Sequence, residues 1–146
     1  MRAVLQRVAR AAVRVGGEEI ASIGTGLLVL VAVAGSDREA DAAWLARKVA
    51  RLRLFPGPRH PIDRSLLDAG GAALVVSQFT LYGDVSGGNR PSFVGSASPE
   101  VAAPLVDRFC DLLAAEGVPV ARGRFGAMMD VDLVNAGPVT LLVDSP

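Results

Sequence analysis

Hydrophobic and polar residues alternate along the first part of the chain. In residues 2–8 and 11–15, β-branched and other apolar side chains recur at every second position, the period of a strand with one buried face. Gly16-Gly17 then reads as a two-residue hairpin turn into a strand over residues 18–23. Residues 27–33 are almost wholly apolar, as in a strand covered on both faces. This pattern predicts a hairpin followed by a central strand.

Two later segments have the helical period instead. Residues 36–39 resemble a capping box, in which the serine side chain accepts a backbone N–H of the first turn and the glutamate side chain reaches back to the N–H of the capping residue. Pro56 lies beyond the end of the predicted helix. The second helix is expected to begin at Ser98-Pro99-Glu100 and to end at Gly117. Pro104 either kinks this helix or moves its regular part downstream. The expected buried stripes are Leu45, Val49 and Leu52 in the first helix, and Val101, Leu105, Phe109 and Leu112 in the second.

The remaining segments complete a mixed architecture. Residues 56–71 are predicted to be a Pro- and Gly-rich connection, residues 72–79 a second buried strand, and residues 83–98 an irregular loop. Strands mixed with two helices predict a single α/β domain over residues 1–146 with a mixed sheet. Further strands are expected at Val118–Arg122, Val131–Asn135 and Val139–Val143.

Composition narrows the possible partners and compartment. The formal net charge is zero, so the chain as a whole lacks the basic character of a general nucleic-acid binder. Lys48 is the only lysine among 15 basic residues, and although arginine suits phosphate recognition, biased codon usage explains this excess as well.

The single cysteine, Cys110, excludes an internal disulfide and is typical of the cytoplasm. With neither an apolar run of membrane-spanning length nor a signal peptide pattern, we expect a cytoplasmic protein that does not bind membranes.

The usual catalytic side chains are scarce. His60 is the only histidine, lies between prolines and is expected to be exposed, while Cys110 lies on a helix stripe and is expected to be a buried, inert thiol. Asp130 and Asp132 fit the solvated face of a strand better than a catalytic carboxylate pair. No nucleophile elbow, phosphate loop, dinucleotide fingerprint or zinc ligand set is present, so we expect no cofactor and no metal. A hydrolase with these residues would work by positioning, backbone dipoles and a reactive group of the substrate.

Two short motifs place polar or unusual residues where strands end or break. Ser77-Gln78-Phe79-Thr80-Leu81-Tyr82 closes the second buried strand, a common place for ligands, although a strand leaving the core would look the same. Asn135-Ala136-Gly137-Pro138-Val139-Thr140 interrupts two strands. Because proline cannot donate to a ladder, the Gly-Pro step indicates a structural bend, a bulge or a close approach of the backbone to something else.

Together the two motifs resemble the D-aminoacyl-tRNA deacylase family, and the resemblance covers nearly the whole chain. It implies a homodimer of three-layer α/β/β subunits, in which each active site combines the serine-to-threonine segment of one subunit with the Gly-Pro segment of the other. Further landmarks in family order are Met1 to Val8, Gly26 to Val29, Arg90 to Phe93, Ala97 to Pro99 and Gly123 to Phe125.

The resemblance also implies residue roles. Ser77, Gln78, Phe79 and Thr80 would line one wall, and a cis Gly137–Pro138 peptide would direct its carbonyl oxygens at the aminoacyl group. Arg7 would brace the Gly-Pro loop, and Phe125 and Met129 would border the terminal adenine. The partner would be the 3′ terminal adenosine end of aminoacyl-tRNA.

The implied activity is hydrolysis of the ester bond of D-aminoacyl-tRNA and of glycine mischarged on tRNA(Ala), a chiral proofreading step in translation. The 2′-hydroxyl of the terminal adenosine would assist cleavage in place of a protein nucleophile, and L-amino acids would be excluded by the Gly-Pro segment. This agrees with the scarcity of catalytic side chains.

Departures from the family pattern and two alternatives remain. Family members often have other residues at some positions, and these differences bear on tRNA preference and the pocket rim. The positions are Pro61-Ile62-Asp63, Asn89, Ala136 and Tyr82.

A sister group with a trans Gly-Pro step removes some L-amino acids, but it lacks the arginine that matches Arg7. The other alternative is an RNA- or DNA-binding module without hydrolytic activity, against which the zero net charge argues mildly.

Overall fold

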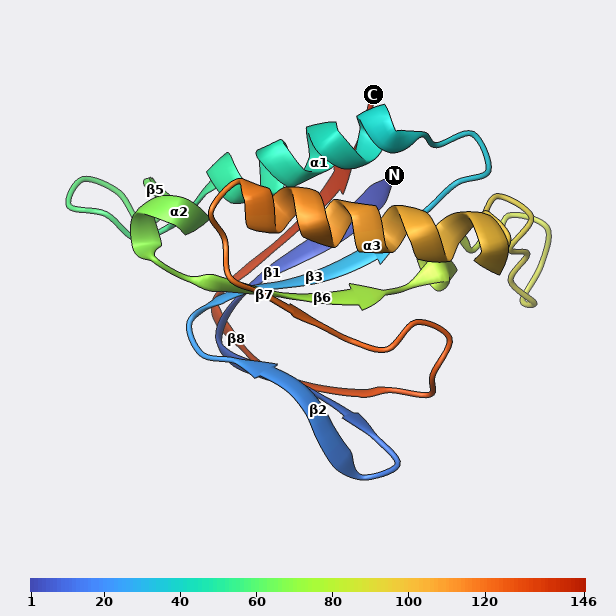
Figure 1. Cartoon of the computed structure of the whole chain (residues 1–146), viewed down its shortest axis with the longest axis horizontal. Helices are drawn as coiled ribbons and strands as arrows, with labels where there is room; N and C mark the ends of the chain where they lie inside the picture. Colours follow the sequence, from blue (N-terminus) through green and yellow to red (C-terminus); the bar gives the residue numbers. More distant parts are fainter.

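A mixed, six-stranded sheet forms the centre of the computed structural model, which describes all 146 residues (Figure 1). The strand order is β2-β1-β3-β6-β7, and β8 pairs with the other edge of β1. β1 is antiparallel to β2, β3 and β8, whereas β3, β6 and β7 are parallel, so the expected mixed sheet is confirmed. The strands are β1 (Arg2–Val15), β2 (Glu18–Ile23), β3 (Gly26–Ala32), β6 (Ala72–Ser77), β7 (Val120–Arg122) and β8 (Asp130–Asp144).

Two long helices, α1 (Glu39–Arg51) and α3 (Pro99–Ala115), lie side by side across one face of this sheet (Figure 1). The larger apolar core fills the space between helices and sheet and includes Leu5, Val29 and Phe109, all fully buried. No helix combines the length and the apolar character that a membrane-spanning helix requires.

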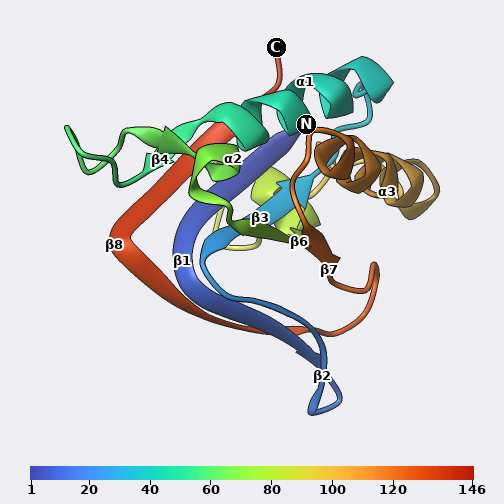
Figure 2. The same ribbon diagram turned by 60° about the vertical axis from the view of Figure 1, so that its left-hand side comes forward.

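The third layer arises because β1 and β8 bend strongly, so that their distal halves and β2 fold back beneath the sheet (Figure 2). A second, smaller apolar cluster fills this β–β space. The three-layer α/β/β arrangement is therefore confirmed, with one core on each side of β3 and β6. The buried members of the smaller cluster are Val8, Ala11, Val13, Leu28, Leu74 and Val76.

The helix predictions need two corrections. The capping box was expected at residues 36–39, but the residue before α1 is Arg38, and its backbone N–H donates to Asp41 Oδ2 at 2.8 Å. In α3 the centre of the buried face lies one residue from the expected stripe: Phe109 is buried as predicted and Leu105 and Leu112 are partly buried, but Val101 is 47% exposed. Helix packing against α1 and the sheet sets this face, and the apolar residues of α3 fit either choice. The residues that α3 buries are Ala102, Val106, Phe109, Cys110 and Leu113.

Pro104 lies inside α3, and the helix continues through it. It is the sixth residue of the helix, so it removes a single hydrogen bond, to the carbonyl of Glu100, near an end that faces solvent. Pro99 occupies the first turn as predicted, although the Ser98 side chain makes no capping hydrogen bond. The helix ends before Gly117, which has a φ of +99°.

The connections hold more structure than the sequence predicted. Residues 56–71, predicted to be a Pro- and Gly-rich connection, contain β5 (Arg64–Ser65), which pairs with β4 (Arg53–Phe55), and the short helix α2 (Leu66–Ala69). α2 is stabilised locally because the Ser65 hydroxyl accepts from the Asp68 N–H at 3.1 Å. The second buried strand ends at Ser77, and the chain continues into the 3-10 helix η1 (Phe79–Tyr82).

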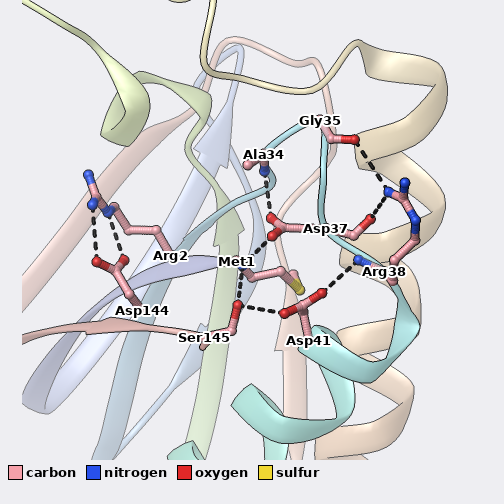
Figure 3. Close-up of polar contacts among 9 residues, drawn as sticks. All are labelled: Met1, Arg2, Ala34, Gly35, Asp37, Arg38, Asp41, Asp144 and Ser145. Carbon is pink, nitrogen blue, oxygen red and sulfur yellow. Dashed lines mark hydrogen bonds and ion pairs between the residues drawn. The ribbon is translucent and has the colours of Figure 1, made fainter.

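Polar contacts tie the start of β1 to the loop before α1 and to the end of β8 (Figure 3). Asp37 lies 2.8 Å from the Met1 amine and accepts the Ala34 N–H at 2.6 Å. Arg2 binds Asp144 through two hydrogen bonds of 2.8 and 3.0 Å. These bonds hold the pKa of the Asp144 carboxyl below its usual range.

Candidate active site

The serine-to-threonine motif lies at the carboxyl end of β6, where the sheet meets solvent. Ser77 is the last residue of the strand, and the Gln78 N–H donates to the Val31 carbonyl at 2.8 Å, so the segment starts from a fixed point beside β3. Gln78 then adopts the irregular backbone angles of a 3-10 helix cap, which turns Phe79 and Thr80 outward; both are exposed.

Phe79 is held in place although 57% of it is exposed. Its ring meets the edge of Phe93 with 5.1 Å between centroids, and its carbonyl accepts from the Ser96 hydroxyl at 2.9 Å. From the other side, Arg2 donates to the Leu81 carbonyl at 3.2 Å. Arg2 was not among the predicted site residues, and an arginine at the start of a strand gives little sequence signal for such a role.

Phe125 and Ser77 line the same small pocket, which has a volume of about 20 Å³ and includes Arg122 and Asp107. Phe125 is 40% exposed. Met129 is half-buried against the smaller core, and its sulfur accepts from the Arg124 N–H at 3.3 Å. The structure thus brings Phe125 to the β6 motif, whereas Met129 supports the turn that carries it.

The Gly-Pro motif forms a bulge in one continuous strand. The sequence predicted two strands here, but β8 runs unbroken from Asp130 to Asp144. Gln6 of β1 pairs with Thr140 and Val8 pairs with Asn135, so four residues of β8 lie opposite Arg7 alone. We call residues 136–139 the Gly-Pro bulge. Its central peptide, Gly137–Pro138, is cis, the isomer that the resemblance implies, and both residues are exposed.

Asn135 and Arg7 hold the two sides of the bulge. The Asn135 side chain accepts the Val139 N–H at 3.2 Å and donates to the Thr140 hydroxyl at 2.9 Å. Arg7 donates to the Ala136 carbonyl at 2.9 Å. Asn135 was missed as a supporting residue, although an asparagine two positions before a Gly-Pro step is a recognisable signal for local backbone bonding.

Arg7 is buried, with 9% of its surface exposed, and forms no ion pair with a carboxylate. Its Nη1 donates to the Leu54 carbonyl at 2.7 Å and to the Pro61 carbonyl at 3.2 Å. One guanidinium therefore joins β1, β4, the loop after β4 and the bulge. The site is left electrically positive, since only carbonyl dipoles compensate this charge.

Within one chain the two motifs are far apart. Arg7, opposite the bulge, pairs with Leu27, which pairs with Ala73, so Ser77 lies four residues farther along β6. At roughly 3.3 Å per residue and three strand spacings of about 4.8 Å, the bulge and Ser77 are about 20 Å apart. The β6 motif and the Gly-Pro bulge therefore do not meet within one chain.

The side chains that could supply ordinary nucleophilic catalysis are not grouped. The Thr80 hydroxyl accepts a hydrogen bond from the Gln78 amide, which is not a base. His60 is exposed, as predicted, and accepts from the Ile62 N–H at 3.1 Å. Cys110 is buried, also as predicted, and burial raises the pKa of its thiol to about 11.

The predicted solvated carboxylates behave as surface residues. Asp130 and Asp132 are exposed, and Asp132 lies 3.4 Å from Arg10 and 3.6 Å from Arg14 on the neighbouring strand. Asp132 is thereby part of a cross-strand ion-pair cluster, and nothing places it beside either motif.

Comparisons with known proteins agree on one family. The model of the family described as D-Tyr-tRNA(Tyr) deacylase matches residues 4–144. The chain is 57% identical to a D-aminoacyl-tRNA deacylase of Chloroflexus aurantiacus over 145 residues, covering 99% of this chain and 91% of that protein. It is 58% identical to a protein of the same name from Thermomicrobium roseum, covering 99% and 94%.

Solved structures show the same fold. A c-Myc DNA unwinding element binding protein superposes with a TM-score of 0.93 at 37% identity, covering 100% of this chain and 99% of that one. A probable eukaryotic D-amino acid tRNA deacylase superposes with a TM-score of 0.84 at 22% identity, covering 98% of both chains, and at this identity it supports the fold alone.

Proposed function

Because the chain belongs to the D-Tyr-tRNA(Tyr) deacylase family, we propose that it is a hydrolase that cleaves the ester bond of D-aminoacyl-tRNA. The products are free tRNA and the D-amino acid. Glycine mischarged on tRNA(Ala) is a second substrate in this proposal. The reaction is a proofreading step of translation that takes place in the cytoplasm and uses neither a cofactor nor a metal.

The observation that carries the proposal is the Gly-Pro bulge, which a buried arginine holds in place. The same chain has no nucleophile–base pair. The backbone of the bulge is exposed to solvent on one side. Arg7 and Asn135 hydrogen-bond to it from the other side and keep it rigid. Rigid, exposed peptide groups suit a site that recognises the backbone of an amino acid.

Selectivity follows from exclusion. The carbonyl oxygens of the bulge would face the α-carbon of the bound aminoacyl group, where a D-residue presents hydrogen and an L-residue presents its side chain. Glycine carries hydrogen at both positions and therefore enters as a D-residue does. A site of this kind gains little from the side chain, so many D-amino acids are accepted, and rejection of L-amino acids rests on a steric clash.

The substrate supplies the missing reactive group. The 2′-hydroxyl of the terminal adenosine lies next to the ester and helps a water molecule to attack the carbonyl carbon. The bond to the 3′ oxygen then breaks, and that oxygen takes a proton as the tRNA leaves. Ser77, Gln78, Phe79 and Thr80 position the ester, and Phe125 and Met129 border the adenine in this arrangement.

A homodimer completes each site. Since the β6 motif and the Gly-Pro bulge are about 20 Å apart in one chain, an aminoacyl group that contacts both must lie between two subunits. The bulge is exposed on β8, whose outer edge pairs with no strand of the same chain and carries exposed apolar residues. Those residues are Val134, Leu141 and Leu142.

A direct test is deacylation of D-tyrosyl-, L-tyrosyl- and glycyl-tRNA by the purified protein. We expect the D and glycyl esters to be cleaved and the L ester to persist. Equal release of D- and L-tyrosine would support the sister group that acts on L-amino acids. Tight tRNA or DNA binding without release of any amino acid would support a binding module instead.

A further inference from the structure

An open hollow of about 620 Å³ lies at the C-terminal end of α1, and none of the residues assigned above to the active site lines it. We call it the α1 groove. Four of its six lining residues are cationic, and a tryptophan forms part of its wall. The lining residues are Trp44, Arg47, Lys48, Arg51, Leu52 and Arg53.

The groove holds positive charge that the protein does not neutralise. Arg51 pairs with Glu116 at 2.9 Å, and Arg53 pairs with Asp63. Arg47 and Lys48 take part in none of the ion pairs of the structure. The Lys48 ammonium lies 5.1 Å from the centre of the Trp44 ring. In a protein of zero net charge, this concentration of exposed cations is a local feature.

One end of the groove is joined to the Gly-Pro bulge through hydrogen bonds of Arg7. α1 runs into β4 at its C-terminal end (Figure 2), and Arg53 of the groove is followed by Leu54. The Leu54 carbonyl accepts from Arg7, and the same guanidinium binds the Ala136 carbonyl at the bulge. Arg7 thus links the segment at one end of the groove to the bulge, where the aminoacyl group is proposed to bind.

We infer that the α1 groove binds the phosphodiester backbone of tRNA on the 5′ side of the terminal adenosine, an inference that rests on the proposed function. Arginine and lysine bind phosphate oxygens, and several cations along an open surface suit a polymer with regularly spaced phosphates. The half-buried Trp44 ring, over which the Lys48 ammonium lies, adds apolar surface to the wall of the groove. An acidic protein would meet the same charges, but the link to the bulge places the tRNA substrate here.

The test compares two substrates of different reach. The double variant Arg47→Gln/Lys48→Gln is assayed with D-tyrosyl-tRNA and with D-tyrosyl-adenosine, which ends before the groove. We expect KM for the tRNA to rise about 10-fold at 0.1 M salt, and the salt slope of uncharged tRNA binding to fall by about 1 to 2. The kcat on tRNA and the kinetics on D-tyrosyl-adenosine should stay at wild-type values.

A matched control removes two cations elsewhere. Arg14→Gln/Arg108→Gln changes the net charge equally, but Arg14 lies on β1 beside Glu19 and Arg108 lies on α3 beside Glu39. This variant should keep the wild-type KM for tRNA and the wild-type salt slope. An equal loss in both double variants would mean that net charge alone matters and would overturn the inference.

The remaining outcomes separate this inference from the proposed function. If wild-type protein cleaves neither substrate, the proposed function fails. If it cleaves both, while the groove variant keeps its KM for tRNA and its salt slope, the inference fails and the proposed function stands. If the groove variant changes from dimer to monomer in sedimentation, the groove belongs to a subunit contact, and the inference fails as well.

Discussion

The Arg7 guanidinium donates to the Ala136 carbonyl oxygen across 2.9 Å and thereby fixes the strand β8 at the point where it bulges. No other residue lies opposite the four-residue bulge on β1. Arg2, five residues earlier on the same strand, donates to the Leu81 carbonyl at the end of the β6 motif. One strand therefore supports both candidate parts of the active site through arginine side chains.

Replacing Arg7 by methionine is expected to destabilise the protein and to abolish most activity. Three carbonyl oxygens would lose their donor, so the free energy of unfolding should fall by about 2 to 4 kcal/mol. Urea denaturation measures this change. The matched control is Arg10→Met, because Arg10 lies on the same strand with 62% of its side chain exposed, and it should change stability by less than about 1 kcal/mol. Equal effects of the two substitutions would contradict the bracing role.

Gly137→Ala should impair the bulge more than a comparable change elsewhere. Gly137 has a φ of +125°, and an added Cβ would lie 2.5 Å from Arg7 Nη2. We expect activity on D-tyrosyl-tRNA to fall at least about 10-fold, with a loss of about 1 to 3 kcal/mol in stability. Gly17→Ala is the control: its φ is +82°, but no atom lies within 4 Å of the added Cβ. Retained activity in Gly137→Ala would show that the site tolerates a displaced bulge.

Thr80→Ala should retain activity within about 10-fold of wild type, since the only side-chain partner of this hydroxyl is the Gln78 amide and no base can activate it. A D-tyrosyl-tRNA that ends in 2′-deoxyadenosine should instead react at least about 100-fold more slowly. Single-turnover rates under identical conditions compare the two changes. The opposite pattern, an inert alanine variant and a fully reactive deoxy substrate, would assign the chemistry to Thr80.

Mixing two inactive variants should restore activity if sites are shared between subunits. A Gln78→Ala dimer and a Gly137→Ala dimer are unfolded, mixed and refolded, which makes about half of the dimers heterodimers with one intact site each. We expect about a quarter of wild-type activity, which exceeds the residual activity of either variant refolded alone. No recovery, with heterodimers verified by mass spectrometry, would place the complete site within one chain.

Cys110 should resist alkylation in the folded protein. Burial raises the pKa of its thiol to about 11, so the reactive thiolate is present at about one part in a thousand at pH 8. Labelling with iodoacetamide should be slow at pH 8, should accelerate as the pH rises toward the pKa, and should become fast in 8 M urea, where the thiol is exposed. Rapid labelling of the native protein would mean that α3 opens readily.

Local chemistry made the hairpin turn and the break at the Gly-Pro step readable from the sequence. Gly16 and Gly17 have φ angles of +60° and +82°, as a turn that favours glycine requires, and the turn joins β1 to β2 as predicted. The two strands predicted at residues 2–8 and 11–15 form the single strand β1, in which the burial alternates only in the first half. The apolar stretch after the hairpin became the central strand β3, and the Gly-Pro step became a bulge. Each of these features depends on residues that are neighbours in the chain.

The tertiary structure decided what depends on packing between distant segments. The apolar residues of α3 allow two adjacent faces, and contact with α1 and the sheet selects the one that buries Ala102 and Val106. The sequence likewise shows both motifs but not their separation, which follows from strand order and register. Those are fixed by hydrogen bonds between β1, β3, β6 and β8, and such long-range pairing leaves no periodic trace within any single segment.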